Sequence, residues 1–318
     1  SRALTTCLVL AACAREAPLA CAPGNAGLIL PAGFCAQVLA DSVGSARHIA
    51  IAPNGDILVA LRDSTGGVLV LRDTNGDGVA DVRGTFGPPL ANGLAFFDGH
   101  VYVGTYTAVI RLPWTDRSLA MGEPKVIVAD LPRQSGHAAK FIAIANDGSL
   151  FINVGAPSNS CQEQDRSEGS RGMDPCPLLE RSGGIWRFDA RRPGQRLEAG
   201  VRRATGLRNV VALTVGPDGS TLWGVQHGRD LLAANWRKQL PVFTDQKGAE
   251  NPAEELFQID ARVDFGWPYC YYDNDLKRKV LAPEYGGDGE TEGRCATAGR
   301  PLVAFPAHWA PESMVFYT

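Results

Sequence analysis

The stretch of sequence that decides the fold is His48-Ile-Ala-Ile-Ala-Pro-Asn-Gly-Asp-Ile-Leu-Val-Ala60. Apolar and small residues alternate before and after Asn54-Gly55. An Asn-Gly pair between two such runs is a strong short-range signal for a hairpin, because a tight turn needs residues that tolerate positive φ. The segment therefore predicts two antiparallel strands joined by a two-residue turn.

This hairpin unit recurs along the chain. Clear copies with an Asp-Gly turn lie at residues 141–154 and 211–223, and a degenerate copy lies at residues 92–103. The copies start roughly 45 to 70 residues apart, a spacing typical of four-stranded propeller blades enlarged by loops. A β-sandwich is the alternative, but it would not repeat one hairpin so regularly. Further strands are predicted at residues 68–71, 184–188 and 255–259.

Composition supports an all-β protein with many turns. The chain has 318 residues, of which 45% are hydrophobic and 20% charged, so it is not a disordered protein. Its 36 glycines and 21 prolines exceed average usage, and helical periodicity of three turns or more is absent. The net charge of -3 gives no indication of a nucleic acid or an acidic membrane surface as a partner.

The first residues resemble an export signal. Small and apolar residues lead into Leu10-Ala-Ala-Cys13, which is similar to the bacterial lipoprotein box in which the cysteine is lipidated. We therefore expect a partial signal segment at residues 1–13, a linker at 14–27 and a propeller domain at 28–318. The protein is expected in the periplasm, with membrane contact only through a lipid anchor. A short buried segment is the alternative for residues 3–12.

The cysteines fit an oxidising compartment. Six of the eight lie outside the signal segment and could form three disulfides in fifteen ways. Pairing of neighbours in sequence favours one set, and no Cys/His cluster has the spacing of a zinc site. The favoured pairs are Cys21–Cys35, Cys161–Cys176 and Cys270–Cys295.

Polar residues precede several predicted inner strands. His137 comes just before one hairpin, and Arg208 and Asn209 come just before another. Equivalent loop ends of a propeller converge on the mouth of its central channel, so these residues are expected to share a pocket. Any one of them alone would more simply be a surface residue. Residues 226–230, 265–269 and 308–311 supply further polar and aromatic candidates.

From about Leu28 onward the chain resembles the superfamily of soluble quinoprotein glucose dehydrogenases and L-sorbosone dehydrogenases. Residues 155–159, 175–177 and 183–188 are most similar to the sorbosone dehydrogenase branch. The resemblance implies a six-bladed β-propeller that binds pyrroloquinoline quinone (PQQ) and Ca²⁺ and oxidises a sugar hydroxyl or hydrated aldehyde. It also implies an electron acceptor, either a cytochrome or a quinone. The motifs that carry the resemblance are Leu30-Pro-Ala-Gly-Phe34, Arg47-His-Ile-Ala-Ile-Ala-Pro-Asn-Gly55, Gly136-His-Ala-Ala-Lys140, Gly206-Leu-Arg-Asn209, Asp264-Phe-Gly-Trp-Pro268 and His308-Trp-Ala-Pro311.

The resemblance also implies roles for single residues. His137 matches the family's general base, and Arg208 and Asn209 match the residues that contact the quinone carbonyl. The segment from Gln226 matches cofactor contacts, with the backbone carbonyls of His227 and Gly228 on the PQQ-bound Ca²⁺. The positions of His308 and Trp309 match residues beside the cofactor ring.

The chain departs from the family at two places. His227-Gly228 stands where the glucose dehydrogenases have Gly-Pro, which puts the Ca²⁺ ligands in doubt. The sequence also ends at Thr318, before the part where the family carries a Lys and Arg residues that clamp the PQQ carboxylates. We therefore expect the C-terminal part of the propeller to be missing.

A separate motif suggests a structural Ca²⁺ site. Side-chain oxygens at Asp73, Asn75, Asp77 and Asp81 occupy positions 1, 3, 5 and 9 of a calcium loop. Gly84 stands where an EF-hand has its Glu, so a full EF-hand is excluded. A plain polar turn between two strands explains the motif equally well.

The sequence is compatible with three functions. The first is a PQQ-dependent sugar or sorbosone dehydrogenase that acts on a CH–OH or aldehyde donor. The second is a lactonase-type, Ca²⁺-dependent hydrolase, which would require several carboxylates in the channel. The third is a non-catalytic binding propeller.

Overall fold

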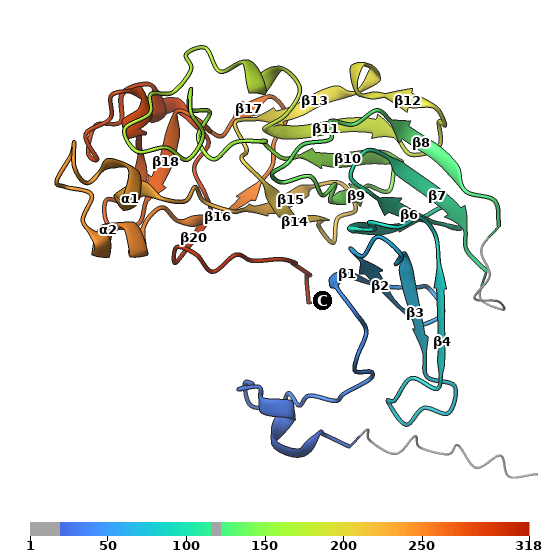
Figure 1. The fold of residues 1–318 in the computed structure, drawn as a ribbon. Helices are drawn as coiled ribbons and strands as arrows, with labels where there is room; N and C mark the ends of the chain where they lie inside the picture. The colour runs from blue at the N-terminus through green and yellow to red at the C-terminus, as the bar shows by residue number, and fades with distance from the viewer. Residues whose placement is uncertain (1–19, 116–121, 318) are drawn as a thin grey trace, which may run out of the picture.

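Four antiparallel β-sheets follow one another in an arc, as the blades of a propeller do (Figure 1). The computed structural model describes residues 20–115 and 122–317. We name the sheets blades A to D in chain order. Blade A contains β1 (Ala46–Ile51), β2 (Ile57–Leu61), β3 (Val68–Arg72) and β4 (Val82–Phe86). Blade B contains β5 (Gly93–Phe97), β6 (His100–Gly104), β7 (Val109–Pro113) and β8 (Lys125–Ala129), and β12 (Gln195–Arg196) adds to β8 in parallel.

Blades C and D are extended by later parts of the chain. Blade C contains β9 (Ile142–Ile144), β10 (Ser149–Val154), β11 (Gly184–Asp189) and β13 (Val201–Thr205), to which β17 (Val263–Asp264) adds in parallel. Blade D contains β14 (Val210–Val215), β15 (Leu222–Gln226), β16 (Glu254–Gln258) and β20 (Val303–Phe305). The parallel additions tie blade B to blade C and blade C to blade D.

The predicted hairpins form the inner half of each blade. In blade A, Ile51 pairs with Ile57 across the Asn54-Gly55 turn, and Gly55 has a φ of 89°. The inner strands β1, β5, β9 and β14 are neighbours in this order. Blade B approaches the chain before β9 so closely that a Cβ at Gly104 would lie 2.1 Å from the Lys140 carbonyl oxygen. Glycine is therefore required at this contact.

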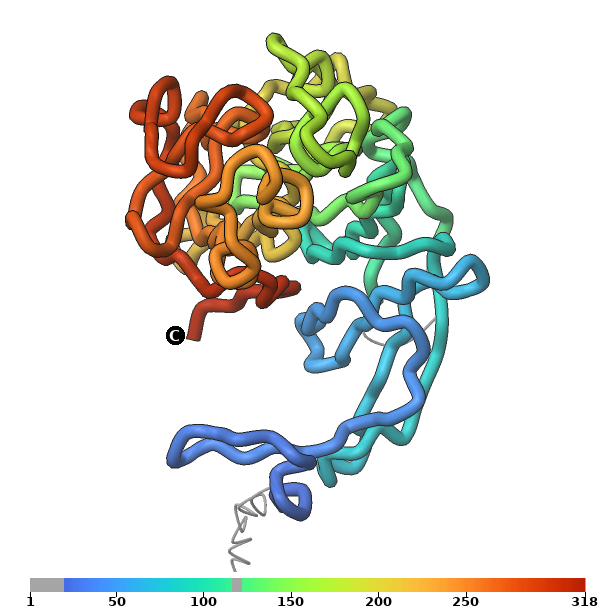
Figure 2. The backbone as a smooth tube through the Cα atoms, turned by 60° about the vertical axis from the view of Figure 1, so that its left-hand side comes forward, coloured from blue at the N-terminus to red at the C-terminus, as the bar shows by residue number. Residues whose placement is uncertain are grey.

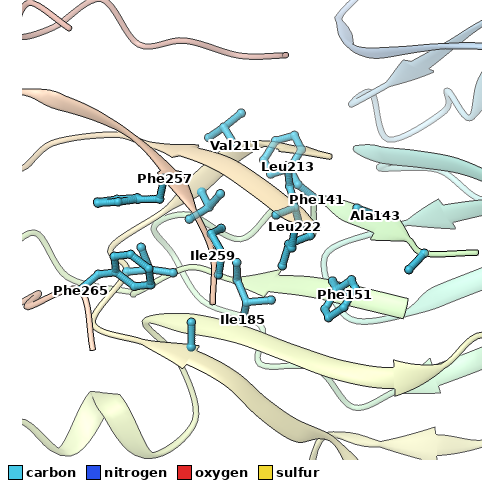
Figure 3. Packing of buried hydrophobic residues seen from close by; sticks show 14 residues of the cluster. Phe141, Ala143, Phe151, Ile185, Val211, Leu213, Leu222, Phe257, Ile259 and Phe265 are labelled. Atoms are coloured by element: carbon cyan, nitrogen blue, oxygen red, sulfur yellow. The ribbon is translucent and has the colours of Figure 1, made fainter. Parts of the chain in front are cut away.

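Buried apolar side chains fill the spaces between neighbouring blades. The largest cluster joins blades C and D, and Figure 3 shows within it Phe151, Leu213 and Phe257 from three different strands and Phe141 from the residue just before β9. A second cluster joins blades B and C, and a third joins blades A and B. These inter-blade cores fix the order of the blades and hence the loops at each end of their strands.

A smaller unit packs beside blade D. It contains α1 (Leu232–Trp236), α2 (Asp245–Glu250) and the hairpin of β18 (Cys270–Asp273) and β19 (Arg278–Leu281). The described residues also contain five short 3₁₀ helices: η1 (Pro23–Gly27), η2 (Pro177–Glu180), η3 (Leu197–Ala199), η4 (Pro283–Tyr285) and η5 (Gly293–Thr297). Within the described ranges, none of the helices has the length and apolar character needed to cross a bilayer.

The all-β propeller predicted from the sequence is confirmed, with four blades in the described residues. The blades form an open arc in Figures 1 and 2. All three expected disulfides are present, at Cys21–Cys35, Cys161–Cys176 and Cys270–Cys295. The predicted signal segment with Cys13 lies outside the described residues, and the domain limits, the six-bladed ring and the missing C-terminal part stay predictions.

Candidate functional site

A pocket of about 690 Å³ lies at the rim where the inner strands begin. Each blade contributes the residue at or just before the start of its inner strand: Arg47 from blade A, Asn92 from blade B, the chain before β9 from blade C, and Asn209 from blade D. The expected convergence of equivalent loop ends is therefore present. The lining consists of Arg47, Arg62, Asn92, Tyr106, Arg133, Gln134, Ser135, His137, Ala138, Ala139, Phe141, Asn209, Val211, His227 and Glu312.

His137 is held in one orientation and one tautomer. Its backbone has a φ of 49°, and the Gln134 amide fixes the loop by donating to the carbonyls of His137 and Gly155. The ring Nδ1–H donates to the Ala156 carbonyl at 2.6 Å, so the neutral ring carries its free lone pair on Nε2. Burial, and then the nearby charge of Arg208, lower the pKa of His137 to about 4. The ring is therefore a neutral proton acceptor at pH 7.

Asn209 lies against the same glycine as His137. A Cβ at Gly155 would be 2.7 Å from the His137 Cβ and 2.8 Å from Asn209 Oδ1. Asn209 Oδ1 accepts a hydrogen bond of 3.2 Å from the buried Asn153, which fixes the direction of the amide. Asn209 Nδ2 has no partner among the described residues. A free amide donor therefore accompanies the imidazole acceptor.

The Arg208 guanidinium lies outside the pocket. It is almost fully buried, and burial lowers its pKa to about 10, so it remains charged at pH 7. The guanidinium donates to both the carbonyl and the side chain of Asn159, to the Gly228 carbonyl at 2.8 Å and to Asp230 at 3.0 Å. Its donors are thus used by the protein itself.

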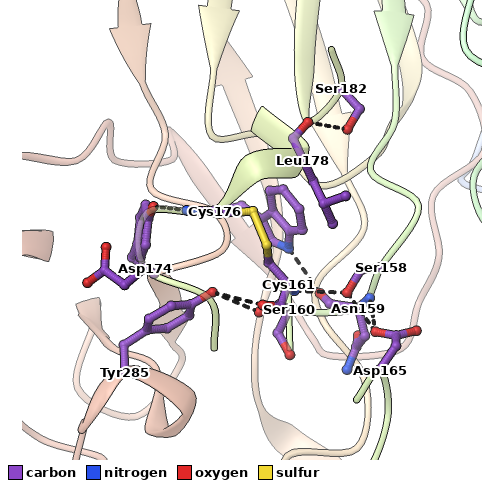
Figure 4. The surroundings of a disulfide bond; sticks show 12 residues. Ser158, Asn159, Ser160, Cys161, Asp165, Asp174, Cys176, Leu178, Ser182 and Tyr285 are labelled. Carbon is purple, nitrogen blue, oxygen red and sulfur yellow. Dashed lines mark hydrogen bonds between the residues drawn. A yellow bond between two sulfur atoms is a disulfide. The ribbon is translucent and has the colours of Figure 1, made fainter. Parts of the chain in front are cut away.

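A disulfide-bonded loop presents Asn159 to Arg208. Figure 4 shows Cys161 bonded to Cys176, with Ser158 and Asp165 closing the turn around Asn159. The Trp267 indole donates to the Asn159 carbonyl at 2.9 Å and braces the loop from the far side.

The segment after β15 supports the pocket from behind. Gln226 accepts from the Arg208 amide and donates to buried Glu255 at 2.7 Å, so its side chain is internal. His227 does line the pocket, and its Nε2–H donates to the Pro311 carbonyl at 3.0 Å. The Gly228 carbonyl accepts a hydrogen bond from Arg208, and the Gly228 amide donates one to Glu254.

Two of the predicted cofactor contacts lie away from the pocket. His308 is exposed and donates to the Gly248 carbonyl at 3.0 Å. Trp309 is 67% exposed and stacks on Phe305. Neither residue lines the pocket that contains His137.

The predicted calcium loop is stabilised by its own backbone. Asp73, Asn75 and Asp77 accept hydrogen bonds from amides of residues 75–79, and Asp81 accepts from Thr74. Among the residues that the structure describes, no group of three or more His, Cys, Asp or Glu side chains is arranged to hold a metal. The polar-turn interpretation accounts for these contacts, and Ca²⁺ binding here stays a prediction.

Sequence reasoning missed several residues of the site. Asn92 and Arg47 hold the same place before or at an inner strand as Asn209, so the rule that selected Asn209 could have found both. Arg62 follows β2, the second strand of its hairpin, as residues 227–230 follow β15, so that position could also have indicated it, whereas Arg133 follows the outer strand β8 and carried no such signal. Lys140 is fully buried, and its ammonium donates to the carbonyl of Ala138 in the pocket wall.

One family model matches this chain, and several solved structures have a similar fold. A family model described as TrAA12-like matches residues 28–318. A Trichoderma reesei structure of Carbohydrate-Active Enzymes Family AA12 has a TM-score of 0.70 at 19% identity, covering 87% of this chain and 71% of that one. The holo form of the pyranose dehydrogenase PQQ domain from Coprinopsis cinerea has a TM-score of 0.70 at 16% identity, with coverage of 87% and 69%.

A bacterial structure is also similar. The PQQ-bound form of aldose sugar dehydrogenase from Streptomyces coelicolor has a TM-score of 0.53 at 18% identity, covering 85% of this chain and 70% of that one. At these identities the likeness shows a shared fold. None of the curated protein sequences matches this chain.

Proposed function

The chain belongs to the TrAA12-like family, and from that premise we propose that it is a PQQ-dependent dehydrogenase that oxidises an aldose or a related sugar aldehyde. The observation that carries the proposal is the pairing of His137 with Asn209 in one pocket. A neutral imidazole with a free Nε2 is a suitable base for a hydroxyl proton, and a fixed amide donor beside it suits an oxygen that gains negative charge.

The residues around this pocket fit PQQ. The volume of about 690 Å³ is within the range of about 300–1,000 Å³ that small-molecule sites occupy. Two pocket residues have buried atoms without a hydrogen-bond partner, Arg47 at Nε and Asn92 at Oδ1. A polar ligand with both donors and acceptors can satisfy such atoms. Asn209 and Arg47 would hold the cofactor, which when bound supplies a quinone that accepts a hydride from the oxidised carbon.

The fit of Ca²⁺ is less direct. The Gly228 carbonyl, a predicted ligand, accepts a hydrogen bond from Arg208. An ion on this oxygen would lie beside a guanidinium, so binding would require that contact to break. The resemblance still favours Ca²⁺ near His227 and Gly228, and we propose it as a cofactor held mainly by backbone carbonyls. Arg208 and Gln226 then act by positioning the segment, and His308 and Trp309 would need to move to reach the ring.

Each residue of the site has a defined part in the proposed reaction. His137 Nε2 accepts the proton of the substrate hydroxyl, and the Ala156 carbonyl holds the resulting imidazolium in place through Nδ1–H. Asn209 Nδ2 donates to the oxygen on which negative charge develops. Arg208 holds the loops that contain Asn159 and Gly228 in place behind Asn209 through its hydrogen bonds to both.

We also propose that the complete ring has six blades. The inner strand β1 exposes Ile49 and Ile51 by 61% and 67%, whereas β9 and β14 are largely covered by neighbouring strands. Further blades beside β1 would cover these apolar side chains. An experimental structure in which solvent surrounds Ile49 and Ile51 would contradict the proposal.

The signal-like N-terminus supports a location for the enzyme. We propose that it is exported to the periplasm, is lipidated at Cys13, and passes electrons to a cytochrome or a quinone. The domain limits at residues 13 and 28 belong to the same proposal. Labelled palmitate should enter the wild type and not Cys13→Ser, and equal labelling of both would contradict it.

Oxidation assays test the central proposal. Addition of PQQ and Ca²⁺ should allow the protein to reduce an artificial dye acceptor with aldoses or sugar aldehydes, and His137→Gln should abolish most of this activity. Hydrolysis of lactones without PQQ would support the lactonase alternative. Sugar binding without either reaction would support a binding propeller.

A further inference from the structure

The pocket carries more positive charge than the rest of the protein. Its lining contains three arginines, Arg47, Arg62 and Arg133, and a single carboxylate, Glu312. His137 is neutral because its pKa is lowered to about 4. The whole chain, in contrast, has a net charge of -3. A positive concave site on an acidic protein concentrates anionic ligands there.

The three arginines differ in how they are used. Arg47 forms an ion pair of 3.1 Å with Glu312. Within residues 20–115 and 122–317, the guanidinium groups of Arg62 and Arg133 have neither a hydrogen bond nor an ion pair. Several exposed arginines elsewhere are paired with acids, namely Arg181, Arg196, Arg237 and Arg294. The two unpaired arginines are thus free to bind an anion.

These two arginines lie on separate walls of the pocket. The Arg62 amide donates to the Ser45 carbonyl at 3.0 Å, which fixes it at the end of β2 beside Arg47. Arg133 lies between β8 and β9, next to Gln134, whose amide holds the His137 loop. A ligand with two or more separated carboxylates can therefore contact both.

We propose that Arg62 and Arg133 bind carboxylates of the ligand in this pocket, and that they anchor the carboxylates of PQQ. The assignment rests on the proposed function. A planar guanidinium can bind a carboxylate through two parallel hydrogen bonds, which also orients the ligand. The anchor lies in blade A and in the loop before blade C.

Equilibrium binding tests the anchor without turnover. PQQ and the redox-inactive benzene-1,3,5-tricarboxylate are titrated into the purified protein, with binding followed by calorimetry and by tryptophan fluorescence. Arg62→Gln and Arg133→Gln should each weaken both ligands by about tenfold, a typical cost of one charge-assisted contact. The double variant should lose about a hundredfold, and the lysine variants should recover part of the affinity.

Two controls make the result specific. Arg192→Gln removes one positive charge from the turn after β11, outside the pocket, and should leave the affinity unchanged. The trimethyl ester of PQQ should bind weakly to the wild type and equally to the variants. Equal PQQ affinity in the wild type and the double variant would overturn the proposal.

The same titrations separate this proposal from the proposed function. Tricarboxylate binding that depends on both arginines, without any PQQ-dependent oxidation, would support the anion site and contradict the dehydrogenase. Normal PQQ binding and turnover in the double variant would support the dehydrogenase and contradict the anchor. If the double variant lost affinity only for an acidic sugar such as glucuronate, and not for PQQ, the assignment of the arginines to the cofactor would be overturned.

Discussion

Arg208 and Asp230 form an ion pair of 3.0 Å outside the pocket that the next residue, Asn209, lines. The guanidinium is nearly fully buried, whereas Asp230 is partly exposed. Arg208 also binds Asn159 and Gly228, so it joins three loops behind the pocket. This arrangement favours a positioning role for Arg208 over direct contact with a ligand.

Loss of Arg208 should therefore affect stability and the charge state of His137 together. Arg208→Met removes the donor to the Gly228 carbonyl and leaves Asp230 paired with Arg166 alone. We expect the free energy of unfolding to fall by about 2–3 kcal/mol, less than for a fully buried pair because water reaches Asp230. The pKa of His137 should rise, because a cation that lowers it is removed. Denaturant titration and NMR of the imidazole measure the two effects.

Replacement of Asp230 gives the matched comparison. The Asp230 carboxylate raises the pKa of His137, so Asp230→Asn should lower this pKa. Opposite shifts in the two variants would support the electrostatic coupling, and an unchanged pKa in both would contradict it.

His137 should be required for turnover and not for folding. His137→Ala removes the free Nε2 and should lower kcat by about 10²–10⁴-fold, the usual loss for a general base. Affinity for PQQ, measured separately, should change little. Steady-state kinetics on the PQQ-loaded variant check this. Near-normal turnover by a folded, loaded His137→Ala protein would assign His137 a lining role only.

The stability of the protein should fall between pH 6.5 and 4 because of His137. Its folded-state pKa of about 4 lies below the unfolded value of about 6.5. In this range the unfolded chain binds the proton and the native protein does not, so stability falls as the pH falls. The contribution of this group is about 3 kcal/mol. The pH dependence of unfolding should be flatter in His137→Gln than in the wild type, and parallel curves would contradict the assignment.

Hairpin signals predicted the blades well, because the Asn-Gly and Asp-Gly turns fix the register locally. The rule that residues before inner strands converge placed His137 and Asn209 together. It missed Asn92 because that hairpin is degenerate, and it did not show that Arg208 points away from the pocket. The direction of a long side chain depends on distant partners such as Asp230, which local sequence does not reveal.

The Cys161–Cys176 disulfide should stabilise both the fold and the Arg208 contact. It closes a loop of 15 residues, for which the chain-entropy model gives about 3 kcal/mol. The loop carries Asn159, which accepts two hydrogen bonds from Arg208. Cys161→Ala/Cys176→Ala should lower the Tm and also weaken PQQ binding. The Cys21→Ala/Cys35→Ala variant, whose disulfide lies before blade A and does not line the pocket, should leave PQQ binding intact. Equal binding losses in both would indicate a general folding defect.

Lys140 should lower the free energy of unfolding, while its hydrogen bond to the Ala138 carbonyl positions the His137 loop. Its side chain has 0% exposure and no acidic partner among the described residues, and burial lowers its pKa to about 7. The unfolded chain keeps this proton up to about pH 10.5, whereas the folded protein loses it above about pH 7. The buried charge therefore destabilises the fold most below pH 7, and this destabilisation declines as the pH rises from 7 to about 10.5. Lys140→Met removes the buried charge and should raise the free energy of unfolding at pH 6 by roughly 1–3 kcal/mol, with a smaller gain at pH 9.

The variant also loses the hydrogen bond to the Ala138 carbonyl, next to His137, so kcat should fall although the protein is more stable. Urea unfolding at both pH values measures the gain, and Lys140→Arg, which keeps the charge, should show none. The expected result is a larger gain in unfolding free energy over the wild type at pH 6 than at pH 9. A smaller gain at pH 6 would show that a partner neutralises the ammonium, so that it is not a buried free charge.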